Sequence, residues 1–94
     1  MKVIAIAQRS TEHSAEDFAP HLEAEAHRAL TLFAEQSFRE LYSRTDGKGA
    51  IIVLEAASED EAREKLESLP LAKLGMLSFD IYGTQPYRGF IANL

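Results

Sequence analysis

The sequence predicts an α+β domain with the ferredoxin-like order β-α-β-β-α-β, in which two helices cover one face of a four-stranded antiparallel sheet. Three observations lead to this fold class. Two amphipathic helix patterns each follow a strand pattern, and an Asp-Gly turn separates two further strand patterns in the middle of the chain. The length of 94 residues is enough for one domain only. We therefore expect residues 1–94 to form a single ferredoxin-like domain.

The first half of the chain predicts a buried strand followed by a helix. Residues 3–7 are a short apolar run rich in β-branched side chains, which is typical of a strand. Ser14 with Asp17 three residues later predicts a capped helix start, and apolar side chains recur every three or four positions over residues 15–34. Pro20 interrupts this pattern, so we expect either a later start with Pro20 in the first turn or a local break.

The middle of the chain predicts a β-hairpin. Residues 38–44 alternate, which would place Phe38 and Glu40 on the same face of a strand. The Asp-Gly pair at residues 46–47 supplies the positive φ that a tight turn needs. Residues 50–56 contain an unbroken aliphatic run, the pattern of a central strand that is covered on both faces.

The last third of the chain predicts a second helix, a fourth strand and a tail. Ser58 and Glu61 form a capping box, and Pro70 ends the helix that follows. Residues 76–82 alternate as a half-buried strand does. Residues 83–94 have no period, and their aromatic side chains have no obvious place on the same domain. We expect this tail to pack on a partner subunit.

The composition argues against several classes of protein. A net charge of −5 disfavours nucleic acid and anionic membranes as partners, because both attract basic surfaces. The absence of cysteine rules out disulfides, thiolate metal sites and a cysteine nucleophile, and is compatible with a reducing cytoplasm. The apolar run at the start is too short for a signal peptide or a membrane span. We expect a cytoplasmic protein.

The predicted fold leaves one face of the sheet without helices. This face carries large apolar side chains, and a domain of this size buries only about 60% of the surface of its unfolded chain. An exposed apolar face on a thinly stabilised domain is typical of a subunit interface. We expect a homodimer or a larger homo-oligomer.

Two segments resemble the muconolactone delta-isomerases. The Leu-Pro-Leu sequence at residues 69–71, with Met76 and an alternating strand that closes at Pro86, is similar to the C-terminal signature of that family. Residues 38–42 match its upstream pattern of aromatic, Arg, any residue, aliphatic and aromatic, and residues 50–54 match the aliphatic strand that follows a glycine-containing turn.

The resemblance spans residues 26–86 and implies a dimeric α/β barrel, in which two ferredoxin-like sheets face each other. It also implies a cofactor-free isomerase that shifts a double bond in a small unsaturated lactone or acid. The sequence departs from the family pattern where Glu40 and Gln85 replace histidines. The missing imidazoles leave an alternative open, namely a non-catalytic dimeric module of the same barrel fold that binds a small ligand.

Acids and phenols on the predicted strands supply candidate site residues. Allylic proton transfer needs a base with a raised pKa and a donor for the developing oxyanion. Glu40 or Glu55 is the candidate base, and Tyr42 or Tyr82 is the candidate donor. For each acid, the alternative is a solvated side chain paired with a neighbouring arginine such as Arg39 or Arg44.

Three further residues are candidate ligand contacts. Asp80 shares a strand face with Tyr82, Arg88 can clamp a carboxylate, and Glu25 borders the apolar stripe of the first helix and can reach a cleft from there. The histidines lack the HxH or HxxxH spacing of a metal site. We expect no metal and no cofactor.

Overall fold

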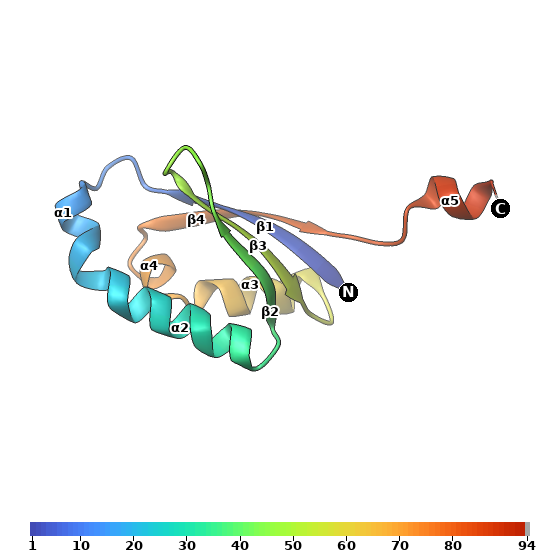
Figure 1. Cartoon of the computed structure of the whole chain (residues 1–94), viewed down its shortest axis with the longest axis horizontal. Coiled ribbons are helices and arrows are strands. Elements are labelled where there is room, and N and C mark those ends of the chain that lie inside the picture. The colour runs from blue at the N-terminus through green and yellow to red at the C-terminus, as the bar shows by residue number, and fades with distance from the viewer. Residues whose placement is uncertain (94) are drawn as a thin grey trace.

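The computed structural model describes residues 1–93 and confirms the four-stranded antiparallel sheet with helices on one face. The spatial order of the strands is β2-β3-β1-β4, and every neighbouring pair is antiparallel. Helices α2, α3 and α4 lie together against the same face of the sheet (Figure 1). The elements are β1 Lys2–Arg9, α1 Ala15–Phe18, the 3-10 turn η1 Ala19–His21, α2 Leu22–Ala34, β2 Phe38–Ser43, β3 Gly49–Glu55, α3 Glu59–Glu67, α4 Pro70–Lys73, β4 Leu77–Gly83 and α5 Arg88–Ala92.

The first helical segment is interrupted at Pro20, which confirms the local break, one of the two alternatives that the sequence predicts. Ser14 caps α1, because its Oγ accepts the Asp17 amide at 3.3 Å while the Asp17 carboxylate accepts the Ser14 amide at 2.8 Å. Pro20 lies in η1, where its missing N–H and fixed φ are tolerated in the first turn, and α2 continues from Leu22.

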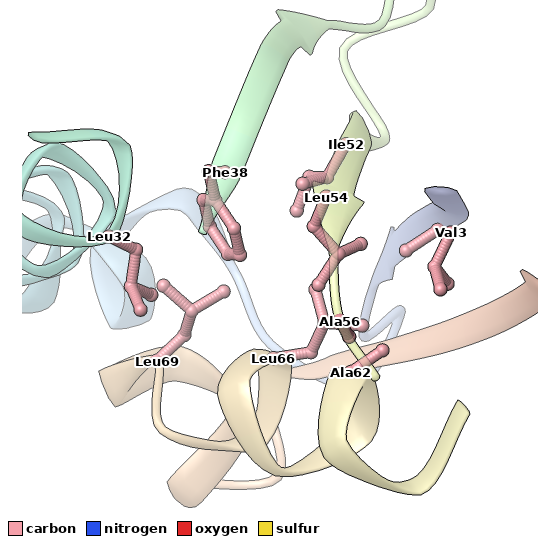
Figure 2. Packing of buried hydrophobic residues seen from close by; sticks show 10 residues of the cluster. Val3, Leu32, Phe38, Ile52, Leu54, Ala56, Ala62, Leu66 and Leu69 are labelled. Atoms are coloured by element: carbon pink, nitrogen blue, oxygen red, sulfur yellow. The ribbon is translucent and has the colours of Figure 1, made fainter. Parts of the chain in front are cut away.

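The core fills the space between the sheet and helices α2 and α3 (Figure 2). Val3 of β1 and Leu54 of β3 contribute from the sheet, and each is fully buried. Leu32 of α2 and Leu66 of α3 meet them from the helices. Each such side chain contributes about 1.5–3 kcal/mol by leaving water.

A β-bulge in β2 separates two residues that the alternation had placed together. Phe38 pairs with Leu54, whereas Glu40 pairs with Val53, so the register shifts across Arg39. Phe38 is consequently 1% exposed in the core, while Glu40 is exposed on the opposite face. The prediction that they share a face is wrong, because strict alternation does not hold through the extra residue of a bulge.

The face of the sheet away from the helices is uncovered, and we call it the open face. The registers of β1 and β3 place Ile4, Ile6, Ile51 and Val53 at its centre, opposite the buried side. Ile51 is 39% exposed. Polar and phenolic side chains surround this centre: Lys2, Gln8, Glu40, Tyr42, Glu55, Ser78, Asp80 and Tyr82. The aliphatic run of β3 predicts a strand that is covered on both faces. In the single chain the helices cover only one of these faces.

The chain ends in a C-terminal arm, residues 84–93. Thr84 is still attached to the sheet, because its amide and hydroxyl both donate to the Lys2 carbonyl, at 3.0 and 2.7 Å. Beyond it the arm leaves the body and carries the short helix α5 (Figure 1), which makes the longest dimension of the chain 53 Å against 27 and 20 Å. The predicted tail of residues 83–94 is thus partly helical, and Leu94 lies outside the described residues.

Gly49 opens β3 at a point where the backbone passes close to β1. Its φ is 157°, and an added Cβ would overlap the carbonyl oxygen of Ala7. We expect Gly49→Ala to lower the free energy of unfolding by at least about 2 kcal/mol, through strain and this overlap. Gly47→Ala is the matched control, because Gly47 has a φ of 72° but no atom within 4 Å of an added Cβ. It should cost only about 1–2 kcal/mol, and equal losses in urea denaturation would contradict the close approach.

Candidate functional site

The candidate site is a pocket on the helix-covered side, between α2 and the strands β1, β2 and β3. Its volume is about 290 Å³, which suits a small ligand. Most of the lining is apolar, including Leu22 and Ala26 of α2, Leu41 of β2 and Ile52 of β3. An apolar lining of this kind suits an apolar ring, which on binding would displace water from a polar group on the wall.

Among the described residues that line the pocket, Glu25 carries the only carboxylate. Its side chain is half-buried, and its Oε1 accepts the backbone N–H of Leu71 at 2.9 Å. Burial raises the pKa of Glu25, and this effect outweighs the lowering by the Leu71 hydrogen bond and by the charge of Arg9. Because the Leu71 bond engages one carboxylate oxygen, the Glu25 carboxylate has a defined position beside an apolar pocket.

The Leu-Pro-Leu segment explains how Glu25 is held. Pro70 is the first residue of α4 and has no N–H, so Leu71 presents an early amide of the helix that has no acceptor within α4. The side chains of Leu69 and Leu71 are 2% and 3% exposed and anchor the segment in the core. The amide thus has a fixed position, and Glu25 from the neighbouring helix accepts it.

One cation, Arg9, acts on Glu25 from outside the residues that line the pocket. The Arg9 guanidinium sits over the Phe18 ring, 4.9 Å from its centroid, and Phe18 is buried. Its charge lowers the pKa of Glu25 in part, which places it within electrostatic range of that carboxylate. No spacing signal in the sequence indicated this relation between Arg9 and Glu25.

The structure brings Glu40 and Tyr42 together on the open face. The Tyr42 hydroxyl donates to Glu40 Oε1 at 2.7 Å, and this hydrogen bond, with the Glu40 charge, raises the pKa of Tyr42. Both side chains are exposed, although Tyr42 also borders the pocket. Arg44 does not pair with Glu40 but binds Asp46 at 2.6 Å. The partner of Glu40 is therefore the Tyr42 hydroxyl and not Arg44, the arginine that the sequence offered as an alternative.

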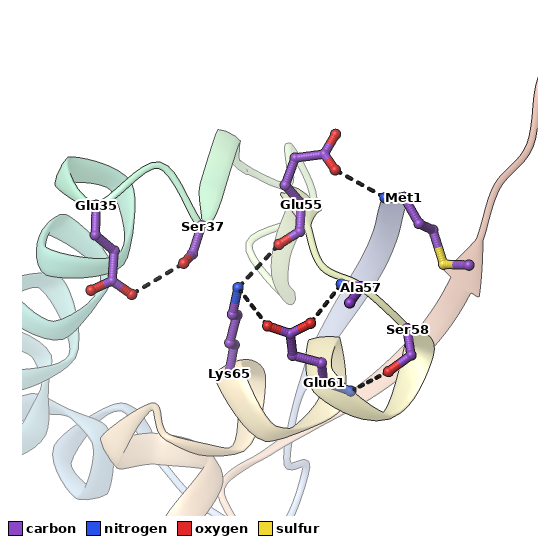
Figure 3. A network of polar contacts seen from close by, with 8 residues as sticks. All are labelled: Met1, Glu35, Ser37, Glu55, Ala57, Ser58, Glu61 and Lys65. Carbon is purple, nitrogen blue, oxygen red and sulfur yellow. Dashed lines mark hydrogen bonds and ion pairs between the residues drawn. The ribbon is translucent and has the colours of Figure 1, made fainter.

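The other predicted site residues are spread over the open face and the arm. Glu55 accepts the N-terminal ammonium group at 3.1 Å, and its carbonyl accepts Lys65 Nζ at 3.2 Å (Figure 3). Asp80 and Tyr82 lie two residues apart on β4 and face the same side as Glu40. Arg88 is in the arm, outside the pocket that contains Glu25. The pocket therefore gathers Glu25 and Tyr42 from the predicted set.

Residues 1–93 contain neither a metal-binding cluster nor a membrane-spanning helix. No group of three or more His, Asp or Glu side chains there is arranged to hold a metal ion. None of the helices in this part of the chain is both long enough and apolar enough to cross a membrane.

We expect the stability contributed by Glu25 to depend on pH. Because folding raises its pKa above the usual 4.5, the folded chain keeps a proton that the unfolded chain releases. The wild type should therefore lose stability relative to Glu25→Gln as the pH rises from 4.5 through the raised pKa, with no further change above it. Urea denaturation between about pH 3 and pH 8 measures the difference.

Asp17→Asn is the control of opposite sign. The hydrogen bonds from Ser14 lower the pKa of Asp17 below 3.8, so the wild type should gain stability over Asp17→Asn as the pH rises toward that value. The stability of the wild type relative to Glu25→Gln should fall with rising pH. If it does not change with pH, or rises as it does relative to Asp17→Asn, the result would contradict the desolvation of the Glu25 carboxylate.

Together, the fold and the pocket define a class of protein: a ferredoxin-like α+β domain with an open sheet face and a half-buried carboxylate between sheet and helix. No family model and no curated protein matches the sequence. Solved structures do match. The chain is similar to muconolactone isomerase, with a TM-score of 0.74 and 16% identity over 93% of this chain and 91% of that one.

It is also similar to the 5-chloro-2-hydroxyhydroquinone dehydrochlorinase TftG from Burkholderia phenoliruptrix AC1100, solved in complex with 2,5-dihydroxybenzoquinone. Here the TM-score is 0.72 and the identity is 17%, over 95% of this chain and 98% of that one. At these identities the likeness concerns the fold, and it confirms the ferredoxin-like subunit expected from the resemblance of residues 26–86 to the muconolactone isomerases. The pairing of two such sheets stays a prediction.

Proposed function

We propose that this protein is a cofactor-independent isomerase that transfers a proton within a small unsaturated lactone or acid, with Glu25 as the base. One observation carries the proposal: the Glu25 carboxylate is half-buried at an apolar pocket and is held by the Leu71 amide. A general base works best when its pKa lies near the working pH, and desolvation moves a carboxylate in that direction.

The reaction is a proton shuttle by one side chain. Glu25 takes a proton from the carbon next to the double bond, so a C–H bond breaks, an O–H bond forms and the electron pair is delocalised onto the carbonyl oxygen. The same carboxylic acid then returns the proton to the far end of the unsaturated system, which shifts the double bond. Tyr42, which borders the pocket, is the proposed donor to the oxyanion, and to act there its hydroxyl must give up the hydrogen bond to Glu40. Tyr82, on the open face, would serve only a ligand bound on that face.

Binding of an acidic substrate needs a cation. Arg9 is within electrostatic range of Glu25 and is the candidate anchor within the same chain. Arg88 is the candidate from the arm of another subunit, and Asp80 remains a proposed ligand contact on the open face. Glu40 or Glu55 would act as base only if a partner covers the open face and removes these carboxylates from water.

We further propose that two copies pair through their open faces in the cytoplasm. The support is the apolar centre formed by Ile4, Ile6, Ile51 and Val53 on a domain of only 94 residues. Such pairing would also enclose the polar rim of the open face.

Hydrogen exchange into a panel of candidate ligands tests the function, because it reports proton abstraction from any member that binds productively. The protein is incubated in D₂O with butenolide-type lactones, unsaturated diacids and hydroxylated benzoquinones, and NMR follows deuterium at their acidic carbons. We expect protein-dependent exchange in at least one lactone or acid. Exchange confined to the quinones would contradict the proposed substrate class.

The second candidate function is a non-catalytic module that binds a small ligand. It is favoured by Glu40 and Gln85, which stand where the resembling isomerases carry histidines. Shifts in melting temperature identify ligands that bind, and the same ligands are then tested for exchange. Binding without exchange would favour the module over the isomerase.

A further inference from the structure

Two side chains of α2 bind the segment that joins α3 to α4. Glu25 accepts the Leu71 amide at 2.9 Å. Three residues further along the same helix, Arg28 donates through Nε and Nη2 to the Ser68 hydroxyl, at 3.1 and 3.0 Å. Residues three apart on a helix lie on the same side of it. Residues 68–71 are therefore held at both ends by one side of α2.

The Ser68 hydroxyl has a defined orientation. It donates its proton to the Lys65 carbonyl at 2.6 Å, so it acts as the acceptor in both hydrogen bonds from Arg28. Ser68 is also the residue at which α3 ends, and a cation such as the guanidinium is favoured at the carboxyl end of a helix. Arg28 and Ser68 are both half-buried. The contact between them is therefore better shielded from water than a surface pair.

The residues that connect the two contacts are stiff. Leu69 is 2% exposed and belongs to the same buried cluster as Leu32 of α2 (Figure 2). Pro70 has a fixed φ, and the Leu71 side chain is buried. A displacement of Ser68 would therefore be passed on to the Leu71 amide.

We propose that Arg28 is a positioning residue for Glu25, because it fixes Ser68 and, through the stiff connection, the Leu71 amide. Arg28 is not among the residues that line the pocket. The charge that acts on the Glu25 carboxylate from another element is that of Arg9 on β1. Arg28 thus acts through the position of the amide and not through its own charge. Only the consequence for catalysis rests on the proposed function.

The Leu71 amide proton tests the inference without any substrate. An amide that donates to a carboxyl group forms a stronger hydrogen bond when that group is ionised, so its NMR signal moves downfield. We expect this shift as the pH rises through the pKa of Glu25, and we expect Glu25→Gln to abolish it. Arg28→Met and Ser68→Ala should each lose most of the shift. The double variant should lose no more than either, because both changes remove one contact.

Arg63→Met is the matched control. Arg63 is an exposed arginine of α3 that pairs with Glu67 at 4.0 Å, so the same change of side chain is made away from residues 68–71. It should leave the Leu71 titration as in the wild type. A full shift in Arg28→Met or in Ser68→Ala would overturn the inference. So would losses that add up in the double variant, or an equal loss in Arg63→Met.

Deuterium exchange on the same variants tests the consequence for catalysis. If Glu25 is the base, Arg28→Met should lower the exchange rate at least about tenfold with little change in ligand affinity, because a small displacement of a reacting group is costly. An unchanged rate despite a lost Leu71 shift would overturn the positioning role. Failure of the proposed function looks different: Glu25→Gln would then leave exchange unaffected, while Arg28→Met would still lose the Leu71 shift.

Discussion

Glu25→Gln should lower the rate of deuterium exchange into the substrate by at least about 100-fold, the contribution typical of a general base. The amide keeps the size of the side chain and can still accept the Leu71 N–H, but it cannot take a proton from carbon. The dissociation constant for the ligand should therefore change little. NMR exchange rates and calorimetric binding on the same preparation separate the two effects.

Glu40→Gln and Glu55→Gln are the matched controls for this prediction, because each removes one carboxylate from the open face. If Glu25 is the base, both variants should catalyse deuterium exchange into the substrate at a rate within about threefold of the wild-type rate, because neither residue contacts the reacting atoms. A large loss in either of them, with Glu25→Gln active, would place the base on the open face, where the sequence predicts it.

Ile51→Lys should raise the dissociation constant of self-association at least about 100-fold, because a buried, unpaired ammonium group costs several kcal/mol. Ile51 lies at the centre of the open face, opposite Ile6 on one side and Tyr42 on the other. Its side chain is 39% exposed in the single chain, so the monomer can accept a lysine there. Sedimentation velocity at micromolar concentration measures the association, and circular dichroism confirms that the variant folds.

Leu74→Lys is the control for the open-face prediction. Leu74 is 50% exposed and follows α4, outside the sheet, so the same change of chemistry should leave association unaltered. A wild type that is monomeric at micromolar concentration would contradict the proposed pairing. So would an Ile51→Lys variant that associates as tightly as the wild type.

The order of the elements could be predicted because it depends on local chemistry. The N-caps at Ser14 and Ser58 define two helix starts, and the turn at residues 46–47 defines the hairpin. Pro20 marks the break in the first helical segment for a reason that needs no tertiary contact, namely its missing N–H and fixed φ.

The bulge in β2 could not be predicted in the same way. The position of Phe38 depends on the depth of the core beneath β2, where an aromatic ring is buried against Leu54 and Leu32. That burial outweighs regular alternation, and the strand accommodates it by inserting Arg39 into the ladder. Because of this insertion, Glu40 lies on the open face while Phe38 stays in the core.

The candidate site shows a similar division. The sequence named Glu25 as a residue that could reach a cleft, and it singled out residues 69–71 as a motif, but it indicated no link between them. The link is a hydrogen bond between groups 46 residues apart, from Leu71 to Glu25. Arg9 was missed because its relation to Glu25 also depends on the way the first strand and the first helix pack.

By itself, the sequence determined the fold class, because periodicity, caps and turn chemistry act over a few neighbouring residues and are written directly in the chain. It also determined which acids and phenols were available for chemistry. Only the tertiary structure decided which carboxylate leaves water, because desolvation depends on what packs around a group. That packing separates Glu25, beside the pocket between α2 and the sheet, from Glu40, on the open face.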